Sequence, residues 1–246
     1  MRRKIFALLL ALSLCLTACG TAVPEPERLP EGENTGPEVS YIPLYDRPVN
    51  ADRVVYLAES LGYRLTMPEE DLYRTRLDGQ DSNPNGTAYG DRAGLYAWLQ
   101  DREAAGCDRY ILSLDQLLSG GLVNSRSFPG ADVVLQDGTV LTEEAFLAAI
   151  LDLLADGENE VYLLDTVMRL APTVGYDGWD LAGYEALRSY GMAARPTLSG
   201  DALTVENIAA AYPLGADGTP LDPADYGVTE EEVAQYLHCR ERKLRL

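Results

Sequence analysis

The stretch "ILSLDQLLSGGLVNSR", residues 111–126, decides the fold class of this chain. It begins with an apolar run without polar alternation, which is typical of strands covered on both faces. Comparable runs lie at 39–45 and 160–165, and segments with a helical pattern separate them. Repeated strand–helix units predict parallel strands with right-handed crossovers. We therefore expect an α/β fold with a mainly parallel sheet, either half of a TIM-like barrel or an open doubly wound sheet.

The boundaries of these elements follow from local signals. We expect strands at 39–45, 63–67, 109–115 and 160–165, with helices between them. Four of the expected helices begin after a residue that can cap them. Asn50 precedes a helix to about Leu61, and Asp91 precedes one to about Ala105. Thr142 precedes the next helix, and Thr229 forms a capping box with Glu232 for a last helix to about Arg242.

Polar residues follow three of the expected strands. They are Asp46, Arg47 and Asn50 after the first; Asp115, Gly120, Gly121, Ser125 and Arg126 around the end of the third; and Asp165 and Arg169 after the fourth. Ligands of parallel α/β folds bind beyond the carboxyl ends of the strands, so this pattern predicts a polar site there. The alternative is structural, because Asp–Arg pairs also tie loops together and Gly-Gly also turns a chain.

The chemistry of these residues suits a polar ligand. If the third and fourth strands are neighbours, about 4.8 Å apart, Asp115 and Asp165 can lie at the roughly 5–9.5 Å separation of a glycosidase carboxylate pair. We take these two as the candidate acid/base or nucleophile pair. Gly120 and Gly121 let the backbone approach a ligand or form an N–H nest, and arginine forks orient hydroxyls, carboxylates or phosphates.

Three segments together resemble a bacterial family known as domain of unknown function 4127. They are "YIPLYDRPVN", "LSLDQLLSGGLVNSR" and "LLDTVMRLAPT", and "YLHCRERKL" resembles a further block of that family. Tyr45 stands where the family tends to have an acid. The resemblance implies that the chain is the N-terminal part of a longer family domain, and it implies no activity.

The best hypothesis for function is a glycan-directed hydrolase that uses the strand-end aspartates. The alternatives are a non-catalytic solute-binding lipoprotein, a metal-assisted phosphoester or amide hydrolase whose aspartates hold Mg²⁺, and an inactive truncated fragment. A carbohydrate or another small polar molecule is the expected ligand. The sequence identifies no cofactor and no metal site.

The N-terminus has the pattern of a bacterial lipoprotein signal. Arg2, Arg3 and Lys4 precede the apolar segment 5–16, which is too short for a confident membrane span. Small residues before Cys19 resemble a lipobox, which implies cleavage after residue 18 and lipid on the Cys19 sulfur. We expect a signal peptide at 1–18, a flexible Pro/Glu-rich tether at 19–38, an α/β domain at 39–246, and anchoring to the extracytoplasmic face of the cell membrane.

The net charge of −19 argues against nucleic acid as a partner, which needs a basic surface. Loss of residues 1–18 removes three cations and no acid, which makes the mature chain more acidic still. Cys107 and Cys239 then remain for the fold, and two buried thiols are favoured over one disulfide. The chain has a single histidine, His238, so a multi-histidine zinc site is excluded. We expect His238 on the surface of a helix.

Two further patterns have structural explanations that we favour. Asp81, Asn83 and Asn85 resemble the start of a calcium loop, but Arg92 stands where a liganding acid is needed. A surface turn explains them better. Tyr176, Tyr184 and Tyr190 near Trp179 could stack on sugar rings, although core packing is the commoner use of such aromatics.

Overall fold

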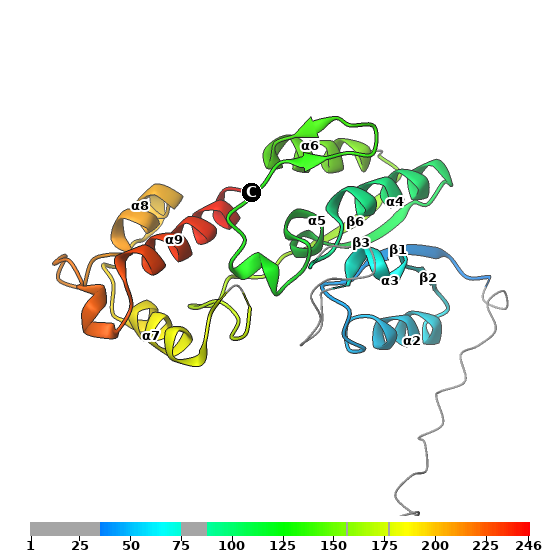
Figure 1. Ribbon diagram of the computed structural model, residues 1–246. Helices are drawn as coiled ribbons and strands as arrows, with labels where there is room; N and C mark the ends of the chain where they lie inside the picture. Colours follow the sequence, from blue (N-terminus) through cyan, green and yellow to red (C-terminus); the bar gives the residue numbers. More distant parts are fainter. Residues whose placement is uncertain (1–34, 75–87, 156, 177) are drawn as a thin grey trace, which may run out of the picture. The chain divides into compact units, whose positions relative to one another are not determined.

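The computed structural model describes residues 35–74, 88–155, 157–176 and 178–246 (Figure 1). The expected signal peptide, Cys19, most of the expected tether and the Asp81–Asn85 pattern lie outside these described residues. Within them, no helix is both long enough and apolar enough to cross a bilayer.

The central feature is a four-stranded parallel sheet. Its strands in spatial order are β2 (Arg64–Thr66), β1 (Glu38–Ile42), β3 (Arg109–Ser113) and β6 (Glu160–Leu164). Every neighbouring pair is parallel, with Val39 opposite Leu65, Tyr41 opposite Ile111, and Ile111 opposite Tyr162. The expected α/β class with a mainly parallel sheet is therefore confirmed.

The strand order distinguishes between the two architectures left open by the sequence. A barrel half would keep consecutive strands as neighbours, whereas here β1 lies between β2 and β3. The chain thus adds β2 on one side of β1 and then crosses to add β3 on the other side. This reversal is the mark of an open doubly wound sheet, and ligands in such sheets bind at the carboxyl ends of the two strands where the order reverses.

Helices cover the sheet from both sides because right-handed crossovers in opposite directions end on opposite faces. Figure 1 shows α2 (Asp52–Ser60) on one side of the strands, and α4 (Arg92–Ala104) and α6 (Glu143–Leu153) on the other. Leu95 and Leu99 of α4 share one apolar core with Tyr110 and Leu112 of β3.

A second apolar cluster lies among the last helices, α7 (Leu181–Met192), α8 (Val205–Ala211) and α9 (Glu230–Arg245). Leu187, Tyr190, Tyr236 and Cys239 are fully buried or nearly so in it. Trp179 also packs there, so the favoured core role of these aromatics is confirmed for Trp179 and Tyr190.

The remaining elements are short. They are α3 (Glu70–Tyr73), α5 (Leu114–Ser119), the 3₁₀ turns η1 (Asn124–Arg126), η2 (Gly200–Ala202) and η3 (Pro223–Tyr226), and the antiparallel pair β4 (Val133–Val134) and β5 (Val140–Leu141). Cys107 and Cys239 are buried thiols that form no disulfide with each other, and His238 is exposed on α9, as expected.

Three of the four predicted helix caps are confirmed. Asp91, Thr142 and Thr229 each accept a hydrogen bond from the backbone three residues on, and Thr229 forms the capping box with Glu232. The Asn50 cap is wrong: the N-cap residue of α2 is Ala51, which makes no side-chain cap bond. The N–H of Asn50 already donates to the Arg47 carbonyl, so a turn occupies the position where the cap was expected.

Candidate functional site

Asp115 does not end a strand, as the sequence suggested, but lies in the first turn of α5. The strand stops at Ser113, whose hydroxyl accepts a hydrogen bond from the Gln116 N–H at 3.3 Å and caps the helix. A local side-chain cap therefore ends β3 two residues early, because it gives the chain a helical alternative to the ladder.

Gly120 and Gly121 end this helix. Gly120 adopts a left-handed conformation with φ of 73°, and its N–H donates to the Gln116 carbonyl at 2.9 Å. The Gly121 N–H donates to the Asp115 carbonyl at 2.9 Å. A Cβ on Gly120 would lie 2.9 Å from the Gly90 carbonyl oxygen. Both N–H groups are thus engaged inside the chain, so the glycines serve a helix end and a close backbone approach.

The two candidate aspartates meet at one ammonium group. Lys243 of α9 forms an ion pair with Asp115 Oδ1, and its Nζ lies 3.0 Å from Asp165 Oδ1 and 3.2 Å from Thr166 Oγ1. The Asp115 side chain is 0% exposed, whereas that of Asp165 is 46% exposed. The cluster therefore has a buried carboxylate and a solvent-accessible one on either side of a single cation.

A small cavity of about 30 Å³ adjoins this cluster, which is room for about one water molecule. It is lined by Leu114, Asp115, Leu118, Ser119, Asp165, Arg242, Lys243 and Leu246. Oδ2 of Asp115 is buried without a hydrogen-bond partner in the described part of the chain. An unsatisfied buried carboxylate oxygen is costly, so this atom is a natural acceptor for a donor that enters the cavity.

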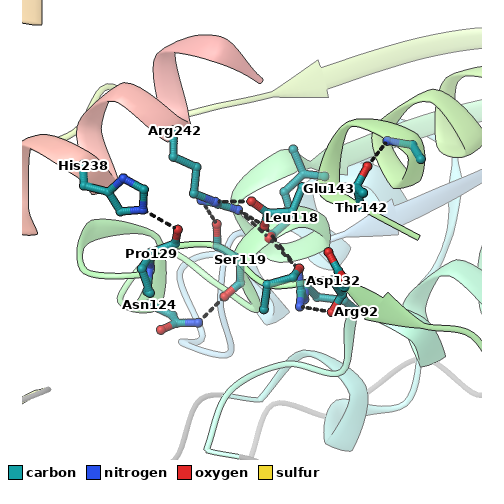
Figure 2. A network of polar contacts seen from close by, with 12 residues as sticks. Arg92, Leu118, Ser119, Asn124, Pro129, Asp132, Thr142, Glu143, His238 and Arg242 are labelled. Atoms are coloured by element: carbon teal, nitrogen blue, oxygen red, sulfur yellow. Dashed lines mark hydrogen bonds and ion pairs between the residues drawn. The ribbon is translucent and has the colours of Figure 1, made fainter. Parts of the chain in front are cut away.

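A polar network holds α9 in place beside the cluster (Figure 2). The guanidinium of Arg242 donates to both carboxylate oxygens of Glu143 at 2.6 Å, to Ser119 Oγ at 3.1 Å and to the Leu118 carbonyl at 2.8 Å. Arg92 reaches the same Glu143 carboxylate at 3.4 Å. Because Arg242 precedes Lys243, this bidentate pair positions the lysine against Asp115.

Arg126 and Arg169 lie together near this cluster. Arg126 Nη1 donates to Thr173 Oγ1 at 2.9 Å, and Arg169 Nη2 donates to the same oxygen at 3.4 Å. Burial lowers the pKa of Arg126, and the nearby charge of Arg169 lowers it further, whereas the charge of Asp115 acts in the opposite direction. The structure thus brings both predicted arginines to one hydroxyl that the sequence did not single out.

Ser125 and the residues after β1 have other surroundings. The buried Ser125 hydroxyl donates to the Leu122 carbonyl at 2.9 Å. Arg47 is exposed, with its guanidinium 5.5 Å from the centre of the Tyr45 ring. Asp46 is half-buried, and Asn50 uses its carbonyl to accept from the Tyr41 hydroxyl at 2.6 Å. Within the described ranges, no hydrogen bond or ion pair joins Arg47 or Asn50 to the Asp115–Lys243–Asp165 cluster.

The sequence reasoning missed Lys243, Thr166 and Thr173. Lys243 lies in "YLHCRERKL", in which the sequence predicts a terminal helix and a family-like block but no role for the lysine. A cation in the last turn of a helix is normally explained by its interaction with the helix dipole. The position of Lys243 in the sequence therefore does not indicate a contact with Asp115. Thr166 and Thr173 lie in the same motif as Asp165 and Arg169. This proximity in sequence was the one signal that could have indicated them as site residues.

Residues 39–195 match the family described as "Protein of unknown function (DUF4127)". The chain belongs to this family. The DUF4127 match includes Asp115, Asp165, Arg126 and Arg169, and ends before α9 with Lys243. No curated protein and no solved structure shows significant similarity to the chain. In the described parts of this DUF4127 member, no three His, Cys, Asp or Glu residues gather in an arrangement that could hold a metal ion.

Proposed function

We propose that this DUF4127 protein captures a polar, carbohydrate-type solute at the carboxyl edge of its sheet. The observation that carries the proposal is the Asp115–Lys243–Asp165 cluster beside a cavity, with Asp165 half exposed and Asp115 Oδ2 unsatisfied. The half-exposed carboxylate of Asp165 offers acceptors, and the Thr166 hydroxyl offers a donor, to the hydroxyls of a sugar at this edge.

Binding is favoured over hydrolysis by the state of Asp115. A catalytic carboxylate must reach the reacting bond, whereas the Asp115 side chain is fully buried and held by Lys243. Capture of a solute requires only the accessible groups, Asp165, Thr166 and the arginines. The cluster can therefore bind a ligand without any rearrangement of its buried half.

Glycan hydrolysis is the second candidate, and one observation favours it. Asp115 and Asp165 both contact one Nζ atom, so the contacting oxygens lie no more than about 6 Å apart. That upper bound includes the roughly 5–5.5 Å separation of carboxylates in retaining glycosidases. Lys243 would have to leave the space between them before a glycosidic bond could enter.

A panel of saccharides tests both candidates. Binding is measured by calorimetry for the wild type, Asp165→Asn and the control Asp152→Asn, which changes an exposed aspartate of α6. Capture predicts saturable binding that Asp165→Asn weakens and Asp152→Asn leaves unchanged. Product release from the same saccharides would establish hydrolysis instead, and the absence of any saturable binding would refute both.

Membrane anchoring is a separate part of the proposal. A lipid on Cys19 would attach the protein to the extracytoplasmic membrane surface, where a captured solute is accessible. Support comes from the lipobox-like residues before Cys19. Expressed in a bacterial host, the protein should enter the detergent phase on phase separation, and Cys19→Ala should abolish this. A wild-type protein that stays in the aqueous phase would refute the anchor.

A further inference from the structure

Two positive side chains converge on one neutral oxygen at this site. Thr173 Oγ1 accepts from Arg126 Nη1 at 2.9 Å and from Arg169 Nη2 at 3.4 Å. Among the described residues, neither guanidinium takes part in an ion pair with a carboxylate. A hydroxyl group carries no charge, so this shared contact does not itself offset the repulsion between the two arginines.

The surrounding charges do not remove that repulsion. The positive charge of Arg169 lowers the pKa of Arg126, in addition to the effect of burial. Asp115 acts in the opposite direction, but it is already ion-paired with Lys243. Among the described residues, three cations, Arg126, Arg169 and Lys243, therefore lie close to the carboxylates Asp115 and Asp165, in a chain of net charge −19. Such a concentration of positive charge in an acidic protein is typical of an anion site.

The backbone holds both arginines in fixed places. Arg126 ends η1, which begins just after the Gly120–Gly121 turn, and the Ser125 N–H donates to the Gly121 carbonyl at 3.0 Å. The Arg169 carbonyl accepts from the Tyr236 hydroxyl of α9, and the preceding Met168 is buried. The backbone at both arginines is thus fixed, so a ligand has only their side chains left to order.

We propose that Arg126, Arg169 and Thr173 form a subsite for an oxyanion: the carboxylate, sulfate or phosphate group of an acidic solute. This deepens the proposed function and rests on it for the carbohydrate part of the ligand. Guanidinium groups bind such oxygens through paired N–H donors, and the Thr173 hydroxyl can donate once an anion accepts from the arginines. The neighbouring Asp165 and Thr166 would then face hydroxyl groups of the same solute.

The test is calorimetric titration of the purified chain at constant ionic strength. The probes are D-glucuronate, inorganic sulfate and inorganic phosphate, with D-glucose as the uncharged comparison. The variants are Arg126→Gln and Arg169→Gln, and the matched control is Arg188→Gln on the exposed face of α7. Thermal unfolding of each variant shows whether it is folded.

We expect saturable binding of at least one anion, weakened about tenfold or more by Arg126→Gln or Arg169→Gln and unchanged by Arg188→Gln. Arg126→Lys should restore only part of the affinity, since it keeps the charge and loses the fork. Tighter binding of D-glucuronate would identify a carboxylate ligand, and tighter binding of phosphate or sulfate would identify an ester.

Two outcomes would overturn the subsite: no saturable binding of any anion, or equal weakening by Arg188→Gln. Failure of the proposed function is a different result. Saccharide binding in a protein that binds none of the anions supports solute capture and overturns the oxyanion subsite. Anion binding that Arg126→Gln removes, in a protein that binds no saccharide, supports the subsite and overturns the carbohydrate proposal.

Discussion

Lys243 of α9 forms an ion pair with Asp115 of α5 across 128 positions of sequence. The Asp115 side chain is fully buried and that of Lys243 is 11% exposed, so both charges are largely removed from water. The same ammonium also contacts the half-exposed Asp165. This one contact joins the last helix to the edge of the sheet where the candidate ligand site lies.

The first prediction concerns the stability that this contact provides. Lys243→Met leaves Asp115 buried without its cation, and we expect a loss of about 3–5 kcal/mol in the free energy of unfolding. The control Arg245→Met removes an exposed ion pair with Glu206 and should cost less than about 1 kcal/mol. Urea unfolding measures both. Equal losses for the two variants would show that the buried pair has no special role.

The second prediction separates the two aspartates. Asp165→Asn should lower solute binding with little effect on stability, because its side chain is half exposed. Asp115→Asn should cost about 1–3 kcal/mol of stability, because it weakens a buried charge-assisted bond. If the pair works as one unit, the double variant binds no worse than the poorer single one. Calorimetry beside thermal unfolding measures this, and strictly additive losses of binding would contradict a joint role.

The third prediction concerns the glycine that ends α5. Gly120→Ala places a Cβ 2.9 Å from the Gly90 carbonyl oxygen and requires a left-handed conformation, so we expect a loss of more than about 2 kcal/mol. Gly106→Ala is the matched control: its φ is 80°, but a Cβ there meets no atom within 4 Å. It should cost only about 1–2 kcal/mol. Urea unfolding that shows no difference between the two would mean that the close approach to Gly90 is not tight.

The fourth prediction concerns the edge strand β6. The side chains of Tyr162 and Leu164 on this strand are 56% and 50% exposed. An apolar edge strand promotes association between chains. We expect the protein to self-associate as its concentration rises, and Leu164→Lys to suppress this.

Sedimentation at several concentrations measures that association. Leu203→Lys provides the control, because Leu203 is 60% exposed and lies outside the sheet. Suppression by both changes would point to net charge as the cause. A wild-type protein that stays monomeric and highly stable would contradict the role of the β6 edge.

Local signals were sufficient for much of this fold. The parallel strands, the helices between them and the caps at Asp91, Thr142 and Thr229 follow from apolar runs and short-range hydrogen bonds. The same local reasoning failed at Asn50 and at Asp115, where a turn and the Ser113 cap compete with the expected element. In both places two local structures were possible, and the surrounding chain selected one.

The sequence by itself determined the α/β class and the three Asp–Arg motifs, because apolar period and composition are properties of neighbouring residues. Only the tertiary structure decided the strand order, the meeting of Asp115 and Asp165 at Lys243, and the convergence of Arg126 and Arg169 on Thr173. These depend on which strands pair and on how α9 packs through Arg242 and Glu143. Contacts between residues far apart in sequence are selected by the burial and pairing of whole elements, which no local pattern specifies.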